Sequence, residues 1–220
     1  MHIGLIGGIG PAATDFYYRK LITAAKESGR DLDLTMVHAD TATLLANLAG
    51  GREAEQCAIY SRLTDRLVAA GAENVVVTSI AGHFCIDRFT AMSLLPVIDL
   101  TRVLTRWLQD KGFRRVGIMG TDTVMRTGMY GKLEPVEVLA PEGDNLQKVH
   151  EAYVTLAQSG QPTDALRDVF LEAGNALVAR GAEAVLLGGT DLNAILNEDV
   201  ATFPLVDCAS IHIEEIARSI

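Results

Sequence analysis

The two halves of the chain carry the same short motifs in the same order. The order is kept and the separations drift only slowly, so we infer that the chain is a duplicated lobe. Each half must then fold into the same kind of structure, which constrains the fold more than composition does. Three segments recur after 113, 110 and 108 positions: Ile3–Gly7 at Val116–Gly120, Gly71–Val77 at Gly181–Leu187, and Pro96–Asp99 at Pro204–Asp207.

Each half alternates short apolar runs with longer segments of helical periodicity. This pattern is typical of βα units, and we predict an α/β fold of two pseudo-symmetric three-layer lobes, each with a mainly parallel sheet flanked by helices. The expected buried strands are Ile3–Ile6, Leu34–Val37, Val75–Val77, Val116–Met119 and Val185–Leu187. The expected helices are Pro11–Lys26, Glu53–Ala70, Leu100–Asp110, Asn145–Gln158, Thr163–Arg180 and Ile211–Ile220.

The repeats also set the expected domain boundaries. We expect an N-terminal α/β lobe over residues 1–98 and a C-terminal α/β lobe over residues 99–207. A C-terminal helix over residues 208–220 is expected to pack back on the first lobe. With 220 residues and 49% hydrophobic content, the chain is long enough to give each lobe a core.

Charge and composition exclude several classes of function. Nineteen Lys and Arg against 28 Asp and Glu give a net charge of −9, which repels nucleic acid and anionic lipid surfaces. No apolar run approaches the roughly 18–20 residues that span a bilayer, and the first residues lack a signal-peptide pattern. We therefore expect a cytoplasmic protein without nucleic-acid or membrane partners. Its three cysteines, which lack disulfide or metal spacing, are expected to be free thiols: Cys57, Cys85 and Cys208.

The ends of the expected strands indicate where a ligand binds. In open α/β sheets ligands bind beyond the strand C-termini, so two duplicated lobes are expected to form a pocket between corresponding strand ends. The duplication predicts which residues line this cleft, as pairs of equivalent positions: Gly8 with Thr121, Ser79 with Gly189, Ile80 with Thr190, and Ala81 with Asp191.

Four segments together carry a family resemblance. The opening Gly4–Thr14 reads GLIGGIGPAAT, and it is followed by three further motifs: Gly71–Glu73 leading to His83, Gly120–Thr121 with Met125 and Tyr130, and Pro204–Asp207 with Ile211 and His212. The first is similar to the Gly-Gly-Met-Gly-Pro-x-Ala-Thr signature of the aspartate/glutamate racemase family, and the others agree with that family over most of the chain. The resemblance implies two pseudo-symmetric lobes with the active site between them, racemisation of an amino acid without a cofactor, and a homodimer.

The chain departs from the family at both catalytic thiols. The family carries one cysteine at the start of Cys-Asn-Thr-x-His and one in Gly-Cys-Thr-Glu, and here these segments are Ser79–His83 and Gly188–Asp191. Racemisation by two bases needs one group to remove the Cα proton and another to deliver one to the opposite face. Glycine does neither, and an unaided serine hydroxyl is a far weaker acid than a thiol. Thiol-based racemisation is therefore disfavoured.

The family's substrate-holding residues are changed as well. An Asn-Thr pair that resembles a carboxylate-holding pair in relatives is replaced here by Ile80 and Ala81. Thr190 remains, and we expect it to hold one carboxylate together with the backbone amides of the turns at Gly8 and Thr121. A small amino or carboxylic acid is the expected ligand.

Several other groups are candidates for the chemistry. His83 follows Ser79 by about one helical turn, so the two side chains are within hydrogen-bonding range, and Asp191 reaches the same cleft by the duplication. A nucleophilic Ser79–His83–Asp191 set and a His83–Asp191 acid/base pair are both open, beside the plain alternative that His83 and Asp191 cap or pack their helices. Cys85 is expected to be a buried apolar group. His2, His150 and His212 show no metal-ligand spacing, so no metal site is expected. The glycine-rich turn does not match a dinucleotide fingerprint, so neither a nicotinamide cofactor nor ATP is expected there.

Three hypotheses about function follow. The first is a racemase-superfamily enzyme that acts next to a carboxylate without the thiol pair, by racemisation, one-sided proton transfer, decarboxylation or hydrolysis. The second is a non-catalytic module that binds a small carboxylate. The third is a chain altered for study, with Ser79 in place of a cysteine, which Gly189 argues against because glycine is not the usual replacement.

Overall fold

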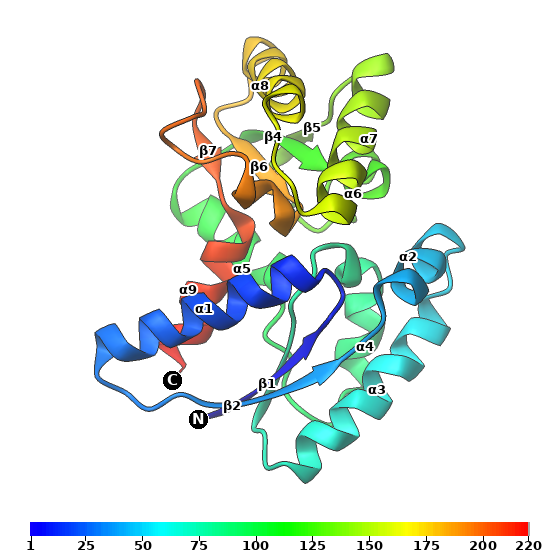
Figure 1. Cartoon of the computed structure of the whole chain (residues 1–220), viewed down its shortest axis with the longest axis vertical. Coiled ribbons are helices and arrows are strands. Elements are labelled where there is room, and N and C mark those ends of the chain that lie inside the picture. The colour runs from blue at the N-terminus through cyan, green and yellow to red at the C-terminus, as the bar shows by residue number, and fades with distance from the viewer. Residues whose placement is uncertain (220) are drawn as a thin grey trace. The chain divides into compact units, whose positions relative to one another are not determined.

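A computed structural model describes residues 1–219, so Ile220, the end of the last expected helix, lies outside the described residues. The chain divides into two compact units (Figure 1). The first holds Met1–Leu100 and the segment from His212 onward, and the second holds Thr101–Ile211. In chain order the elements are β1 (His2–Gly7), α1 (Pro11–Ser28), β2 (Asp33–His38), α2 (Thr41–Ala49), α3 (Glu53–Ala69), β3 (Asn74–Val77), η1 (Ala81–Cys85), α4 (Ile86–Met92), α5 (Leu100–Asp110), β4 (Arg115–Gly120), α6 (Asp122–Arg126), β5 (Glu137–Leu139), α7 (Asp144–Ser159), α8 (Asp164–Ala179), β6 (Val185–Gly188), η2 (Thr190–Ala194), β7 (Leu205–Val206) and α9 (Cys208–Arg218).

Each unit contains a parallel sheet, which confirms the predicted α/β class. In the first unit the strand order is β2-β1-β3, and a parallel bridge from Val75 to Val97 extends it by one position. In the second unit the order is β5-β4-β6-β7. Strands β1, β3, β4 and β6 are almost wholly buried, as expected for parallel strands covered by helices.

The sequence repeat is present in the pairing register of the two sheets. Gly4 pairs with Val75 in the first sheet, and Gly117 pairs with Val185 in the second. The next neighbours also correspond, because Val75 bridges to Val97 as Val185 pairs with Leu205. The register therefore places Ser79 and Gly189 at equivalent positions, two residues beyond β3 and one beyond β6 respectively.

The helices that cover the central strands repeat as well. A Cβ built on Gly4 would lie 2.8 Å from a methyl carbon of Leu67 in α3, and one built on Gly117 would lie 3.0 Å from Leu177 in α8. These glycines let α3 and α8 pack directly on the central strands. A Cβ on Gly7 would instead meet Thr14 of α1, 2.5 Å away, so α1 and α3 cover opposite faces of the first sheet (Figure 1).

The ends of the longer helices follow their sequence signals. Pro11 occupies the first turn of α1, and Gly29 closes that helix with a left-handed backbone. Thr163 caps α8 by accepting a hydrogen bond from the Leu166 N–H. No helix in the described part of the chain is both long and apolar enough to cross a membrane.

Candidate active site

In the first unit, Ser79 lies at the carboxyl edge of the sheet. Its hydroxyl oxygen accepts the N–H of Gly82 at 3.2 Å, at the start of η1. A glycine is needed at 82 because a Cβ there would lie 2.5 Å from the hydroxyl oxygen of Tyr60. Within the first unit as described, no imidazole or carboxylate contacts the Ser79 hydroxyl. The first unit therefore supplies no base of its own to activate this serine.

The contact between His83 and Ser79 differs from the expected one. His83 Nδ1 lies 2.7 Å from the backbone carbonyl oxygen of Ser79, not from its hydroxyl. A carbonyl only accepts, so Nδ1 carries the proton, and Nε2 accepts the N–H of Leu100 at 3.4 Å. Burial lowers the pKa of His83, with Asp99 opposing that effect. Both ring nitrogens of this neutral, buried imidazole are thus engaged by backbone groups.

The duplication indicates what His83 does. The equivalent residue in the second unit is Asn193, whose side-chain amide donates to the Asp207 carboxylate at 3.1 Å. Asp207 in turn caps α9 by accepting the Ser210 N–H at 3.0 Å. His83 contacts the first residue of α5 in the corresponding place. Both side chains thus tie a short 3-10 helix to the start of the helix that follows the Pro-x-x-Asp motif.

The backbone amide of Gly8, in the glycine-rich turn, is hydrogen-bonded within the first unit. Gly8 has a left-handed φ of 84° and donates its N–H to the Thr14 hydroxyl oxygen at 2.8 Å. The Thr14 hydroxyl donates a hydrogen bond to the Gly10 carbonyl, and the Thr41 hydroxyl donates one to the Gly8 carbonyl at 2.6 Å. The expected amide of Gly8 is therefore already hydrogen-bonded, so it is not directed at a carboxylate ligand.

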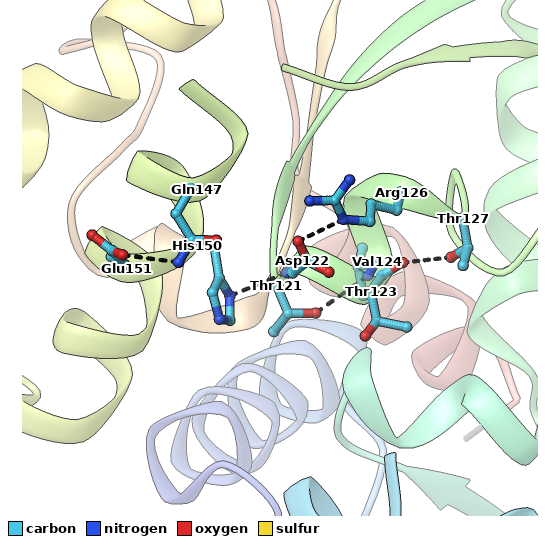
Figure 2. Close-up of polar contacts among 9 residues, drawn as sticks. All are labelled: Thr121, Asp122, Thr123, Val124, Arg126, Thr127, Gln147, His150 and Glu151. Carbon is cyan, nitrogen blue, oxygen red and sulfur yellow. Dashed lines mark hydrogen bonds and ion pairs between the residues drawn. The ribbon is translucent and has the colours of Figure 1, made fainter. Parts of the chain in front are cut away.

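In the second unit, Thr121 lies at the end of β4 and caps α6 (Figure 2). Its hydroxyl oxygen accepts the Val124 N–H at 3.3 Å, while the next amide, that of Asp122, donates to His150 Nδ1 at 3.1 Å. Because Nδ1 accepts, the neutral His150 ring carries its proton on Nε2. The Asp122 carboxylate is paired with Arg126 at 2.7 Å. His150 is part-buried, and its Nε2–H makes no hydrogen bond within the described residues.

Gly189 faces an aromatic ring. A Cβ built on Gly189 would lie 2.2, 2.6 and 2.8 Å from Cε2, Cζ and the hydroxyl oxygen of Tyr153 in α7. The Tyr153 hydroxyl donates to Asp191 Oδ2 at 3.0 Å. Burial raises the pKa of Asp191, and burial followed by the neighbouring Asp191 raises that of Tyr153 well above its ordinary value. At this edge the Tyr153 phenol therefore lies next to position 189, which has no side chain, and the Asp191 carboxyl group accepts the hydrogen bond of that phenol.

The Tyr153 ring predicts a steric cost at position 189. Gly189→Ala should lower the free energy of unfolding by about 1–2 kcal/mol, because its methyl group must displace the ring. The backbone at Gly189 is extended and suits any residue, so no backbone strain is added. In a Tyr153→Ala background the same change should cost less than about 0.5 kcal/mol. Urea-unfolding midpoints of the four proteins measure this, and equal costs in both backgrounds would contradict it.

The remaining predicted positions differ between the units. Ile80 is buried and Ala81 opens η1, whereas the equivalent Thr190 is a buried residue whose hydroxyl has no hydrogen-bond partner in the described part of the chain. The three cysteines are all buried, and burial raises the pKa of each thiol. No group of three or more His, Cys, Asp or Glu among residues 1–219 is arranged to hold a metal ion.

Two residues of this edge were missed from the sequence. His150 has no metal-ligand spacing with a second ligand, and no motif marks Tyr153 as a site residue. Their spacing of three positions within one amphipathic helix puts them on the same face of α7. That spacing was the available signal, but which strand end the face would meet depends on packing.

The chain resembles known proteins both in sequence and in fold. A family model described as Asp/Glu/Hydantoin racemase matches residues 6–216. A candidate Asp/Glu racemase from Yersinia pestis has 25% sequence identity and a TM-score of 0.88, over 100% of this chain and 99% of its own. An aspartate racemase homologue from Pyrococcus horikoshii has 22% identity and a TM-score of 0.81, over 99% of both chains. A glutamate racemase from Francisella tularensis, in complex with D-glutamate, has 15% identity and a TM-score of 0.69, over 99% of this chain and 80% of its own.

Proposed function

The chain belongs to the Asp/Glu/Hydantoin racemase family, and we propose that it binds a small amino or carboxylic acid and transfers a proton at the carbon next to the carboxylate, from one side. The observation that carries this proposal is the pair of equivalent positions Ser79 and Gly189. Neither supplies a thiol, and the three cysteines that exist are buried with raised pKa values. Proton transfer by two opposed thiols therefore has no support in this chain.

The second unit offers donors for a carboxylate. The Thr190 hydroxyl and the His150 Nε2–H are without partners in the described part of the chain, and both belong to the residues around the strand ends. A hydrogen bond from such a donor to a charged group contributes about 1.5–3 kcal/mol. A carboxylate held this way also has its developing charge stabilised when the neighbouring carbon loses a proton.

Acid and base groups are distributed unevenly between the units, which favours one-sided transfer. The second unit carries Asp191 with a raised pKa, and a carboxyl group whose pKa is raised toward neutrality is a better base. The first unit offers the Ser79 hydroxyl without an activating base. Exchange of the α-proton with solvent and retention of configuration is the expected reaction.

A binding module without catalysis is the second candidate. The observation in its favour is that His83, the imidazole next to Ser79, is tied by both nitrogens to backbone groups. The same contacts weigh against a lyase or hydrolase that uses Ser79, His83 and Asp191 as one set. Saturable binding without any exchange or turnover would favour the binding module.

Isotope exchange tests the proposal. The probes are D- and L-aspartate, glutamate and alanine, with succinate and malate, incubated with the protein in D₂O and followed by NMR. We expect deuterium at the α-carbon of at least one probe, with retention. Exchange with inversion would contradict one-sided transfer, and no exchange of any probe would overturn the proposed reaction.

Two substitutions separate binding from chemistry. Ser79→Ala should change the exchange rate by less than about threefold, because no base contacts this hydroxyl. Thr190→Val should raise the half-saturating probe concentration about tenfold, by removing one donor to the carboxylate, with little change in the maximal rate. Thr101→Val, at another buried threonine, is the control for Thr190. A large loss of maximal rate in Ser79→Ala would restore Ser79 as a catalytic group.

Three further properties belong to the proposal. We propose that the protein works without a cofactor, as a homodimer, and in the cytoplasm. Exchange by dialysed, chelator-treated protein tests the first, and sedimentation equilibrium tests the second. The expectation that the strand ends of both units line one cleft stays a prediction.

A further inference from the structure

We propose that the Tyr153 phenol, backed by Asp191, is the proton-transfer group of the second unit, in the place where residue 189 has no side chain. The inference rests on the proposed function and names the group that performs it. It begins from the steric relation between Tyr153 and Gly189, which brings the phenolic end of the ring to 2.2–2.8 Å from an ideal Cβ of residue 189. The hydroxyl therefore lies in the space that the outer atoms of a side chain at 189 would occupy.

The position in the fold is one where a reacting group is expected. Gly189 follows β6 directly, at the carboxyl edge of a parallel sheet, where α/β proteins bind their ligands. Tyr153 reaches this edge from α7, a different layer of the unit, and is part-buried. A glycine at 189 with an ordinary extended backbone is not required by the chain's own conformation. Room for the Tyr153 ring is the physical reason for it.

The hydrogen bond between Tyr153 and Asp191 defines the direction of proton flow. The phenol donates to Asp191 Oδ2 at 3.0 Å, so at rest Tyr153 is protonated and Asp191 accepts. Burial raises the pKa of both groups. A phenol of raised pKa does not hold a negative charge alone, so its proton must leave as another arrives.

The transfer balances with water as the only co-reactant. The Cα–H bond of the bound acid breaks and its proton passes to the Tyr153 oxygen, while the phenol's own proton passes to the Asp191 carboxylate. The electron pair stays on the substrate as the enolate of its carboxylate. Before reversal, the protons on the Tyr153 hydroxyl and on Asp191 both exchange with water. The reverse steps then return the solvent-derived proton on the Tyr153 oxygen to the same face of the substrate, while the Asp191 proton returns to the phenol. Tyr153 is then a catalytic residue, and Asp191 acts through it.

The experiment is the D₂O exchange assay on Tyr153→Phe and Asp191→Asn. Tyr153→Phe keeps the ring over Gly189 and removes only the hydroxyl. We expect its maximal exchange rate to fall at least about 100-fold, within the range that general acid/base groups contribute, with less than a threefold change in half-saturation. Asp191→Asn should reduce the rate similarly. The matched controls are Tyr18→Phe and Asp168→Asn, both at exposed positions, which should keep the wild-type rate.

The outcomes separate this inference from the function on which it rests. Wild-type exchange that persists in Tyr153→Phe would overturn the role of the phenol and leave the proposed reaction standing. Absence of exchange in the wild type would overturn both. A Tyr153→Phe protein with a lower rate but also a thermal midpoint several degrees lower would be compared with Tyr153→Leu. If the exchange rate falls in proportion to the thermal midpoint in both Tyr153→Phe and Tyr153→Leu, the role of Tyr153 is structural, and the inference is overturned.

Discussion

Gly8→Ala is expected to lower the free energy of unfolding by about 4 kcal/mol, a large part of the 5–15 kcal/mol that stabilises a typical domain. Two costs add at this position. The left-handed φ of 84° is strained by about 1–3 kcal/mol for a residue with a Cβ. The Cβ would also lie 2.2 Å from His38 Nδ1 and 2.5 Å from the Ala39 carbonyl oxygen, an overpacked contact of a further 1–3 kcal/mol, roughly.

Gly10→Ala is the matched control because it separates the two costs. Gly10 has a similar φ of 92°, but its Cβ would meet only the Ala13 methyl group at 3.2 Å. It should therefore lose about 1–3 kcal/mol, the backbone cost alone. Urea unfolding followed by far-ultraviolet circular dichroism measures both. Equal losses in the two variants would show that the backbone oxygen of Ala39 and the ring of His38 move aside.

The long elements were predictable because their signals are local. The strands at Ile3–Ile6 and Val116–Met119 and the helix Leu100–Asp110 follow from apolar runs and helical periodicity. The strands β5 and β7, of three and two residues, were not predicted, because such short strands exist only through pairing with β4 and β6. The short helices α2 and α6 were missed for a related reason, since their Asp40 and Thr121 caps also resemble turn residues.

The positions of the candidate site were more predictable than its contacts. The repeat placed Ser79 and Gly189 at equivalent points, and the sheet registers agree. It could not show that Tyr153 lies against Gly189, since that contact depends on how α7 packs on the sheet. A glycine with ordinary backbone angles is itself a signal, because something other than conformation must then require it.

The roles of the histidines were the hardest to predict from the sequence, because each role depends on the hydrogen-bond partners of the two ring nitrogens. His83 was expected beside a serine hydroxyl, and it bonds two backbone groups. His150 carries no sequence signal of a site, and its Nε2–H is unpartnered within the described residues. His212 lies next to His83, and both of its ring nitrogens are also hydrogen-bonded within the protein. Its Nε2 donates to the Ile98 carbonyl and its Nδ1 accepts from the Tyr17 hydroxyl, each at 2.8 Å.

This buried pair predicts a steep loss of stability in mild acid. Burial, followed by the neighbouring His83, lowers the pKa of His212 from 6.5 to about 3. Below pH 6.5 the unfolded chain binds a proton that the folded protein does not bind, so stability falls as pH falls from 6.5 toward 3. Each pH unit costs about 1.4 kcal/mol per histidine, hence about 3 kcal/mol from His212 at pH 4.5. The lowered pKa of His83 adds to this loss, and the nearby Asp99 opposes it.

Carboxylates with lowered pKa values contribute below this window, and Asp191, whose pKa is raised by burial, contributes within it with the opposite sign. The pKa values of Asp40 and Glu183 are lowered below their ordinary values of 3.8 and 4.5 by hydrogen bonds, so their stabilisation is lost only in stronger acid. Urea-unfolding free energies are measured at pH 7.5, 6.5, 5.5 and 4.5 for the wild type and for a His212 variant, and the difference in slope isolates the histidine because the carboxylates are common to both proteins. His212→Gln, which still donates and accepts, should flatten the slope by about 1.4 kcal/mol per pH unit. His38→Gln, at an exposed position, should keep the wild-type slope. If His212→Gln kept that slope too, the acid sensitivity would have to lie outside the contacts of His212 with Tyr17 and Ile98.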